Sequence, residues 1–495
     1  MSKLPSFLRR GAWLGTIAAL VLAGCAVGPD FVRPAPPVAD GYTPEPLLTA
    51  TVAADDQAQR FTPGATVTAD WWKLFKSAQL DAVVAQAIDH NQTLQAAQAS
   101  LRQSQDNLRA GYGVFFPQVG IGASALRERT APVQQGLVSP GSIFNLVTLT
   151  GIINYAIDVF GGARRTVEGL KSQVEDQRYA SKAAYVTLSA NVVNTSIAHA
   201  AYAAQIRATE QLIALESEQL VLTEAQVRAG VSAYSNLLGI RSLIAANQAA
   251  LAPLELKVSQ AEHLLAALEG VVTPKVTVPE IDLTALTLPA DLPVSLPSDL
   301  VRQRPDILSA EAQLHVASAN IGVATAAMFP SFSLDGAYGA AGTSLNNLTA
   351  ADGRFWSTGP SVSIPVFRGG SLWFGRKAAI EAYQASEANY HQTVLNAFAQ
   401  VADALKALEY DAVALQAQAE SKRASGEALN LLQDNYRAGL AAYLDVLTAD
   451  VQYHQATIAY LQALGQRHQD TVALFVALGG GWWNAPGATV GERAP

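Results

Sequence analysis

Two very long helical stretches constrain the fold of this chain more than any other feature of its sequence. Residues 170–229 contain no glycine and no proline, and a later counterpart runs from Arg376 to Ala438. At 1.5 Å per residue, the first stretch would form a helix about 90 Å long. Helices in globular domains average about 11–12 residues. The sequence therefore predicts an architecture whose main elements are far longer than ordinary domain helices.

Each long stretch ends at a nearly identical break. The first is Val227-Arg228-Ala229-Gly230-Val231 and the second is Tyr436-Arg437-Ala438-Gly439-Leu440. An arginine followed by glycine is a reasonable helix stop, because glycine adopts the left-handed conformation and arginine complements the C-terminal dipole. Another helical pattern follows each break, reaching about Leu268 and about Leu478. We therefore expect two giant helical hairpins.

Composition narrows the class of protein. Half of the residues are hydrophobic and 15% are charged, which is not the composition of a disordered chain. The formal net charge is −8, and no basic face is evident, so nucleic acid is not expected as a partner. The single cysteine, Cys25, excludes a disulfide within the chain.

The N-terminus has the pattern of a cleaved export signal. Lys3, Arg9 and Arg10 precede an apolar run from Gly11 to Gly24 that is too short to span a bilayer permanently. The run ends in Leu22-Ala23-Gly24-Cys25, which resembles a bacterial lipobox with Cys25 as the lipidated residue. The alternative is an ordinary signal peptide with an incidental cysteine. Because Ala26 rather than aspartate follows Cys25, the lipoprotein sorting rule implies the outer membrane.

Between the helices, the hydrophobic period changes from helical to alternating. Two segments, at about 115–129 and 143–159, alternate apolar with polar or small residues over the roughly 9–11 residues that a membrane-spanning strand needs. Phenylalanines stand near their ends, where interfacial belts would lie. The apolar positions are Val119, Ile121, Ala123, Ala125, Val147, Leu149, Ile153, Tyr155 and Ile157. A soluble β-hairpin packed on a core is equally compatible with this pattern.

The same order of parts recurs about 210 residues later. Met328-Phe329-Pro330 mirrors Phe115-Phe116-Pro117, and the two Arg-Ala-Gly breaks keep a similar offset, so we infer an internal duplication. Asp70 is predicted to cap the first helix of the first copy. The predicted layout is a signal peptide (1–24), a lipid-anchored extended leader (25–69), a first repeat (70–273, strands about 115–129 and 143–159, helical hairpin about 163–269), a linker (274–297), a second repeat (298–481, strands about 329–341 and 355–367, helical hairpin about 371–478) and a C-terminal tail (482–495).

Four candidate membrane strands in one chain have a physical consequence. Single-chain barrels begin at about eight strands, and an open sheet edge inside a bilayer has no water to bond its N–H and C=O groups. If the strands cross a membrane, the chain must oligomerise to close the sheet. The long helices carry small alanines together with regular polar positions, as expected for the wall of a water-filled tube. The alternative is a two-helix coiled coil exposed on its other sides.

Several motifs together resemble the outer-membrane factor (TolC-like) family of tripartite efflux and type I secretion systems, in its NodT-like lipoprotein branch. The resemblance covers nearly the whole chain. Its motifs are Cys25-Ala26-Val27-Gly28-Pro29-Asp30-Phe31, Asp70-Trp71-Trp72 with Phe75, Leu80 and Asn91, Ile157-Asp158-Val159-Phe160-Gly161-Gly162 with Arg164-Arg165, Leu296-Pro297-Ser298-Asp299-Leu300 with Arg304-Pro305-Asp306 and Ala310-Glu311, Phe329-Pro330, both Arg-Ala-Gly breaks, and Leu478-Gly479-Gly480-Gly481-Trp482.

The resemblance implies a mixed, mainly α fold in which four strands per chain join a trimeric twelve-stranded β-barrel continued by a long α-helical barrel. It also implies a homotrimer in the outer membrane, anchored by palmitate-type acylation at Cys25. The implied partners are a periplasmic adaptor, an inner-membrane pump of the RND type and outer-membrane lipid. The function implied is that of a passive channel for small molecules.

The two breaks map onto the periplasmic tip, where the adaptor docks. The tip residues are Arg228, Ala229, Gly230, Val231, Arg437, Ala438, Gly439 and Leu440. Many family members carry an aspartate just after the second turn, but Ala441 stands there, with Ser232 in the first copy and Asp445 one turn on. These three residues are the candidate pore constriction, and the departure puts an acidic ring in doubt.

No residue set predicts chemistry. The seven histidines fall in helical patterns without metal-ligand spacing, and no nucleophile, base and orienting residue come together, so no enzyme activity, metal or cofactor is expected. Three functions compete: an efflux channel, a lipid-anchored periplasmic coiled-coil scaffold or adaptor without a pore, and an envelope enzyme. The lipobox, the duplicated strands and the matched motifs favour the channel.

Overall fold

The computed structural model describes residues 26–39, 41–55, 57–131, 136, 140–348 and 350–484. Cys25, the predicted signal peptide and the end of the predicted tail lie outside them. The chain forms two compact units, each built from segments of both repeats. Unit 1 combines the described residues up to Arg33 with Leu101–Gln177 and Ala310–Tyr390, and unit 2 combines Pro34–Ser100, Arg178–Ser309 and the described residues from His391 onward.

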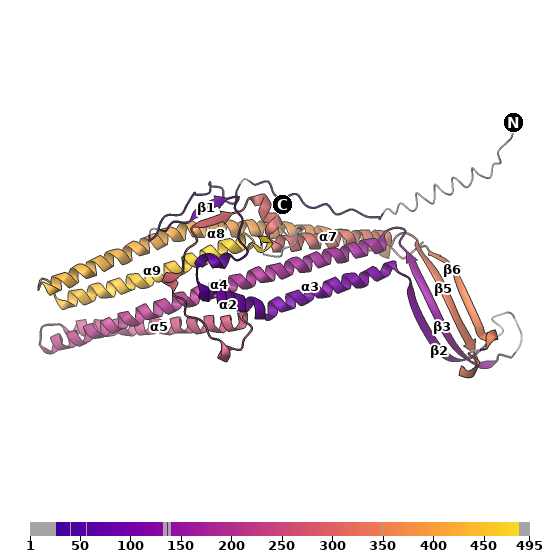
Figure 1. The fold of residues 1–495 in the computed structure, drawn as a ribbon, viewed down its shortest axis with the longest axis horizontal. Helices are drawn as coiled ribbons and strands as arrows, with labels where there is room; N and C mark the ends of the chain where they lie inside the picture. Colours follow the sequence, from indigo (N-terminus) through magenta and orange to yellow (C-terminus); the bar gives the residue numbers. More distant parts are fainter. Residues whose placement is uncertain are drawn as a thin grey trace, which may run out of the picture. The chain divides into compact units, whose positions relative to one another are not determined.

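Both copies of the repeat contain the same large elements in the same order (Figure 1). The long helices α4 (Gly162–Arg228) and α8 (Ser371–Arg437) have 67 residues each, and the helices that follow them, α5 (Tyr234–Leu268) and α9 (Tyr443–Ala477), have 35 each. Equal lengths at both stages indicate that the hairpins descend from one duplicated segment. The shorter helices are α2 (Ala78–His90), α3 (Gln92–Gly111), α6 (Pro297–Gln303) and α7 (Pro305–Ala326).

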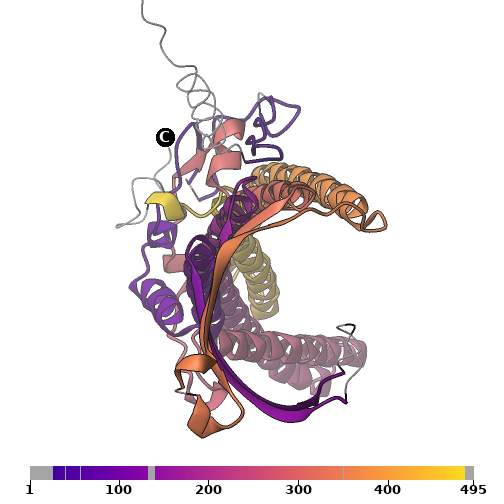
Figure 2. The ribbon, with the colours of Figure 1, turned by 90° about the vertical axis from the view of Figure 1, so that its right-hand side faces the viewer.

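Four strands form an antiparallel sheet in unit 1, which we call the membrane sheet. They are β2 (Gln118–Arg129), β3 (Ile143–Ile157), β5 (Ser331–Gly342) and β6 (Arg354–Ser363), in the order β2-β3-β5-β6. Figure 2 shows the sheet as a curved arc. β6 ends before the predicted boundary at residue 367, since Pro365 has no N–H to donate to a ladder.

The register separates the two faces of the membrane sheet. Gln118, Asn154 and Asp335 lie directly opposite one another on adjacent strands and share the polar face. Asn154 donates to the Asp335 carboxylate, and Ser333 Oγ donates to the same carboxylate at 2.8 Å. One residue along, Val119 pairs with Ile153 on the apolar face, and both side chains are exposed in the single chain. The sheet therefore has one polar and one uncovered apolar face.

A second, smaller sheet was not expected from the sequence. β1 (Arg60–Pro63) pairs in parallel with β4 (Asp291–Val294), and Arg60 forms an ion pair with Asp291 at 2.9 Å. These residues fall in segments predicted as an extended leader and a linker. Each strand has four residues and contains proline, so neither shows the alternation that identifies longer strands.

The predicted helix cap at Asp70 is wrong. Residues Trp71–Phe75 form a short 3₁₀ helix, and the Asp70 side chain makes no capping hydrogen bond but pairs with Lys73 at 2.7 Å. The cap of α2 is Ser77, whose Oγ accepts a hydrogen bond from the Leu80 N–H at 3.2 Å. The indole rings of Trp71 and Trp72 are buried, so the chain before α2 folds inward rather than continuing as helix.

The C-terminal glycine motif packs into the core of unit 2. Trp482 and Trp483 form a cluster with Val186 of α4 and Leu308 of α7, and Trp482 Nε1 donates to the Gln303 carbonyl at 2.9 Å. Next to it, the buried Arg304 guanidinium donates to the Ala477 carbonyl at 2.8 Å and to Asp306 at 2.6 Å. The Arg304-Pro305-Asp306 motif thus ties the start of α7 to the end of α9.

Ionisable side chains are also buried between α8 and α9. Arg467 donates to the Leu408 carbonyl, and the fully buried imidazole of His468 has no hydrogen-bond partner among the described residues. Burial, together with the Arg467 charge, lowers the pKa of His468 to about 4. Burial and the neighbouring Asp411 raise the pKa of Asp470 to about 7, while Gln466 donates to its carboxylate at 2.9 Å.

These two groups give opposite pH dependences of stability. Above its unfolded pKa of 3.8, Asp470 still binds a proton in the folded state. Its contribution to the stability of the folded state is therefore lost as the pH rises toward 7. His468 stays neutral in the folded state below its unfolded pKa of 6.5, so stability is lost as the pH falls toward 4. Between pH 4 and 6.5 the two effects oppose each other.

We therefore predict that replacing either residue leaves a pH dependence of stability set by the other. In D470N, the midpoint of thermal unfolding should fall, relative to wild type, as the pH is lowered from 6.5 to 4.5. In H468L, it should fall relative to wild type as the pH is raised over the same interval. Circular dichroism at 222 nm on the purified, detergent-solubilised protein measures both, and parallel curves for all three proteins would contradict the assignment.

Candidate functional site

Both predicted tip turns lie in unit 2 and have the same backbone geometry. At the end of α4, the Gly230 N–H donates to the Val227 carbonyl and the Val231 N–H to the Gln226 carbonyl, both at 3.0 Å. At the end of α8, Gly439 donates to Tyr436 at 2.9 Å and Leu440 to Asn435 at 2.8 Å. Gly230 and Gly439 have φ of 77° and 74°. Each turn is therefore a Schellman motif. Its glycine position has a left-handed backbone conformation, which glycine adopts most easily.

The apolar residue that follows the glycine in each turn does not pack back onto its own helix. In a Schellman motif, the residue after the glycine usually packs back onto the preceding helix turn. Here that residue is Val231 or Leu440, and their side chains are 76% and 78% exposed. Two equivalent apolar side chains thus stand in solvent at the ends of both hairpins, which the local helix stop does not explain.

The arginines of the turns have local partners. Arg228 Nε donates to the Glu224 carbonyl at 3.3 Å, and Arg437 pairs with Asp434 at 2.8 Å on an exposed surface. Exposed pairs of this kind contribute about 0–1 kcal/mol, so they place the arginines without stabilising the turn much. Ala229 and Ala438 continue the helical hydrogen bonding, donating to Ala225 and Asp434.

The candidate constriction residues directly follow the turns. Ser232 Oγ accepts a hydrogen bond from Asn236 Nδ2 at 3.3 Å, and the Asp445 carboxylate accepts one from the Ala442 N–H at 3.0 Å. Asp445 thereby caps the N-terminus of α9, where a carboxylate also complements the helix dipole. Ala441 offers no polar group. The role of Ser232, Ala441 and Asp445 as the narrowest part of a pore remains a prediction.

One contact ties the two hairpins together near the turns. The Tyr443 hydroxyl of α9 donates to the Glu218 carboxylate of α4, and this hydrogen bond raises the pKa of Tyr443 to about 12. The rings of Tyr436 and Tyr443 lie 5.3 Å apart. Glu218 lies far from Tyr443 in the chain and in the other copy of the repeat, so no local sequence pattern links the two residues.

The residues after Cys25 form a strap on unit 1, which we define as Ala26–Arg33. The Val27 N–H donates to the Phe160 carbonyl at 3.0 Å, and the Phe31 ring stacks on His315 with centroids 4.2 Å apart. Arg33 pairs with Glu311 of α7 at 2.6 Å. The strap is therefore bonded to the connection between β3 and α4 and to α7.

Arg165 of α4 is the centre of this attachment. Its guanidinium is 5% exposed and donates to Asp30 at 2.6 Å, to the Val27 carbonyl at 3.4 Å and to Glu168 at 2.8 Å. Burial alone would lower the pKa of Arg165, but the bonds to Glu168 and Asp30 raise it. The arginine pair Arg164-Arg165 and the segment Cys25–Phe31 were both recognised as motifs, yet nothing in their spacing predicts that they meet.

Glycines make the close approach possible. A Cβ on Gly28 would lie 2.5 Å from the Gly322 Cα, and one on Gly161 would lie 2.5 Å from the Ala26 Cα. Gly28 also has a φ of 98°, which side chains other than glycine rarely adopt. At these two contacts the strap backbone therefore comes so close to its neighbours that only glycine fits.

Asp158, at the entry to α4, has a structural role. Its carboxylate accepts hydrogen bonds from the Ala163 and Arg164 N–H groups at 3.1 and 3.0 Å and pairs with the Arg164 side chain. This is helix capping by a carboxylate. In the part of the chain that the structure describes, no group of three or more histidine, cysteine, aspartate or glutamate residues could hold a metal ion.

An antiparallel sheet with a polar and an uncovered apolar face, continued by two 67-residue helices, defines the subunit of an outer-membrane channel. A family model described as outer membrane efflux protein matches residues 83–271 and 296–480. The chain belongs to this family. It is an outer-membrane component of an efflux system, and its helical part lies in the periplasm.

Individual relatives agree with the family. The toluene efflux pump outer membrane protein TtgC of Pseudomonas putida is 28% identical over 95% of this chain and 96% of its own length. The cation efflux system protein CusC of Escherichia coli is 28% identical over 94% and 97%. The solved structure of the outer-membrane channel OprN has a TM-score of 0.80 at 28% identity, covering 92% of this chain and all of that chain. These relatives are channel proteins and support the channel rather than the scaffold alternative.

We predict that Arg165 holds the strap in place. Replacing it in R165Q removes a charge-assisted hydrogen bond, which contributes about 1.5–3 kcal/mol, so amide exchange in the strap should accelerate roughly tenfold or more. Hydrogen exchange of the peptide containing Val27, read by mass spectrometry, measures this. R109Q, which breaks an exposed ion pair with Asp106 in the same unit, is the matched control and should leave the strap protected. Equal exchange in R165Q and wild type would contradict the role of Arg165.

Proposed function

We propose that three copies of this chain form a passive efflux conduit, with a twelve-stranded barrel in the outer membrane and an α-helical barrel in the periplasm. The observation that carries this proposal is the open membrane sheet. β2 and β6 are its edges and have no partner strand among the described residues. Inside a bilayer their unpaired backbone groups would be costly, so strands from other copies must complete the sheet.

The helical part also lacks partners within one chain. α5 is long and apolar enough to resemble a membrane span by length and composition, but only 6% of its most apolar window is buried. Its place in the periplasmic part argues against a membrane span. Contact with helices of neighbouring copies would bury this surface.

Imaging of the purified mature protein in detergent by single-particle electron microscopy tests the assembly. We expect end views with three-fold symmetry and a tube whose helical part is roughly 90 Å or more, from the rise of 1.5 Å per residue. Single or paired rods without a barrel would contradict the trimer. Two-fold or four-fold end views would keep the channel but refute the proposed number of copies.

We infer that Cys25 is acylated, with palmitate as an expected chain, and that the anchor sits at the junction of sheet and helices. The strap supports this inference because Ala26, the next residue, lies against Gly161 in the connection between β3 and α4. A lipid attached there would enter the inner leaflet beside the barrel without a long tether.

We infer that a periplasmic adaptor docks on the two tip turns and that an RND-type inner-membrane pump supplies the substrate. Val231 and Leu440 support the docking role because both turns expose an apolar side chain at the same position after the glycine. The conduit has no catalytic role in this proposal. Relatives are named for toluene efflux and for cation efflux, which indicates that this architecture serves different substrates. We therefore propose that the conduit carries small molecules, without naming a narrower class. Ser232, Ala441 and Asp445 remain the proposed constriction.

Substituting the exposed tip residues should disrupt docking without unfolding the chain. We predict that V231Q/L440Q abolishes export complementation and adaptor cross-linking, since both side chains are solvent-exposed and contribute little to stability. The matched control is V221Q/L431Q, which changes two similarly exposed side chains earlier in α4 and α8, before the turns. Loss of export in both double variants, or in neither, would contradict docking at the tip turns.

A further inference from the structure

The helices of the two repeats correspond residue by residue. A shift of 209 residues takes Gly162 and Arg228, the ends of α4, to Ser371 and Arg437, the ends of α8, and the same shift takes α5 to α9. The helices before the strands are related by a shift of 213, since α3 begins at residue 92 and α7 at residue 305. The residue correspondence between the repeats is therefore fixed on both sides of the strands.

The same two shifts reproduce the pairing of the strands. Moving β2 by 213 residues and β3 by 209 turns the pair Gln118 and Asn154 into Ser331 and Ser363, which lie opposite each other on β5 and β6. The two hairpins therefore have equivalent registers as well as equivalent helices. A contact known in one repeat can be transferred to the other by these shifts.

One strand pairing joins the two repeats, and it has no counterpart in a single chain. β3 of the first repeat pairs antiparallel with β5 of the second, with Ile153 opposite Gly336 and Asn154 opposite Asp335. The equivalent neighbour of β6 is a strand that begins another first repeat, and none lies there in the described residues of one chain. β2 of a second subunit has the required direction, since β2 and β6 run antiparallel to each other.

We propose that β6 pairs with β2 of a neighbouring subunit in the register that β3 has with β5. The two shifts place Val362 opposite the partner's Ala123, and Ser363 opposite the partner's Gly122. This inference rests on the proposed trimer and specifies which residues of two subunits meet. The chain thus contains, between its own repeats, a template for the contact between its copies.

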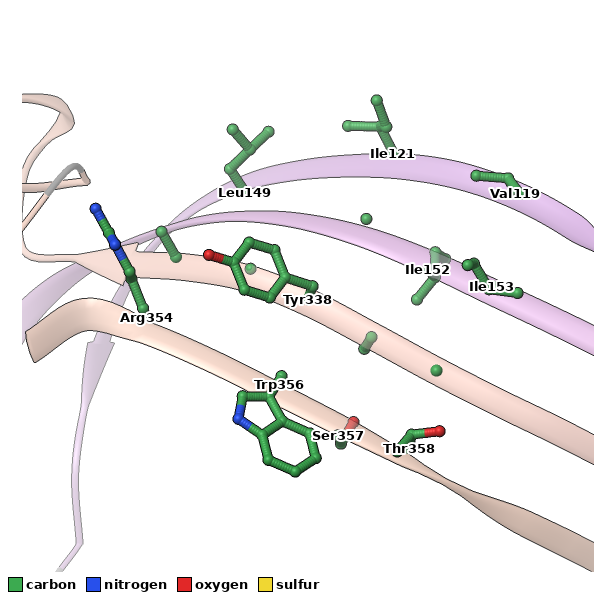
Figure 3. Close-up of a pocket in the computed structure, with 15 residues that line it drawn as sticks. Val119, Ile121, Leu149, Ile152, Ile153, Tyr338, Arg354, Trp356, Ser357 and Thr358 are labelled. Atoms are coloured by element: carbon green, nitrogen blue, oxygen red, sulfur yellow. The ribbon is translucent and has the colours of Figure 1, made fainter. Parts of the chain in front are cut away.

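The exposed apolar residues of the two sheet edges support this register. It places Ile364 opposite the partner's Ile121, and Val366 opposite the partner's Val119. In the single chain these four side chains are 62%, 82%, 90% and 73% exposed, respectively. Figure 3 shows Val119 and Ile121 on β2 at one margin of the apolar face and Trp356 on β6 at the other. The apolar face therefore continues across the subunit boundary.

Other registers agree less well with the structure. A shift by one residue would move the apolar side chains of β2 to the polar face of the sheet. A shift by two residues would follow from matching the Val-Phe pairs that come after β3 and β6, which are 207 residues apart. That spacing takes Asn154 to Ser361, whereas the strand partner of Ser331 is Ser363. The observed pairing of β5 and β6 therefore selects the shift of 209.

The helices beside the sheet give a second, independent contact. A Cβ on Gly169 of α4 would lie 3.7 Å from the Ala319 Cβ of α7, which is the Cβ separation found in disulfides. The shifts transfer this contact to Ala378 of α8 and the partner's Asp106 of α3. Both residues are exposed in the single chain. They mark where the helices of two subunits should approach most closely.

Disulfide cross-linking in isolated outer membranes tests the register. V362C/A123C and S363C/G122C place cysteines opposite each other in adjacent ladder pairs, so one of the two is a close, non-hydrogen-bonded pair. Within one chain β2 and β6 lie about 14 Å apart along the sheet, at roughly 4.8 Å per strand, which a disulfide cannot bridge. Both variants should give covalent dimers and trimers that a reductant removes. Wild type, whose only cysteine is Cys25, should give none.

Shifted pairs are the matched controls. V362C/I121C, V362C/A125C and S363C/G120C move one cysteine by two residues, to a diagonal separation of about 7–8 Å, and should not cross-link. I364C/I121C should cross-link, because the proposed pairing continues past Ser363. Cross-linking of a shifted pair in place of the predicted pair would overturn the register and leave the trimer intact.

A378C/D106C tests the helices independently of the strands and should also give covalent dimers and trimers. Its failure would overturn the transferred helix contact. Failure of every predicted pair in a protein that keeps three-fold end views would refute this interface alone. Failure of every pair together with loss of three-fold symmetry would instead refute the proposed function.

Discussion

The constraint on which the rest of the structure depends is that a bilayer offers no water to an unpaired strand edge. The chain supplies a sheet of four strands, and its edges β2 and β6 end in backbone groups that only another strand can satisfy. The helical part is incomplete in a similar way, because α5 has an apolar surface that one chain does not bury. The monomer is therefore physically incomplete in both of its parts, and the proposed trimer would supply the strand and helix partners that one chain lacks.

Much of the fold could be predicted because its signals are long and regular. Residues 170–229, which contain no glycine or proline, supply nearly all of the 67-residue α4, and the repeated Arg-Ala-Gly break marks where it ends. Alternation at Val119 and Ile121 predicted both the strand and its apolar face, because side-chain direction in a strand has a period of two. The duplication strengthened each prediction, since a weak pattern gained support when it recurred.

The contacts that hold the parts together could not be predicted, because they join residues that are distant in sequence and have several local alternatives. Asp70 and Ser77 are both good capping residues, and only packing of the tryptophans decides that Ser77 caps α2. Arg165 reaches Asp30 across the fold, and no spacing rule links them. At the tip, sequence identified the turns, but whether Leu440 packs back or stays exposed is a tertiary outcome.

Exposed apolar side chains have a different meaning in each part of this protein, and the neighbouring polar groups distinguish them. On the membrane sheet, Ile121 belongs to a continuous apolar face that ends at arginines, which matches hydrocarbon bounded by charged headgroups. At the tip, Leu440 is a single apolar side chain beside the exposed Arg437–Asp434 ion pair, on a surface that is otherwise polar and exposed to solvent. Covering such an apolar group by another protein would remove its surface from water, which is favourable. In the proposed function, the same residue type would thus contact lipid in one part and a protein partner in the other.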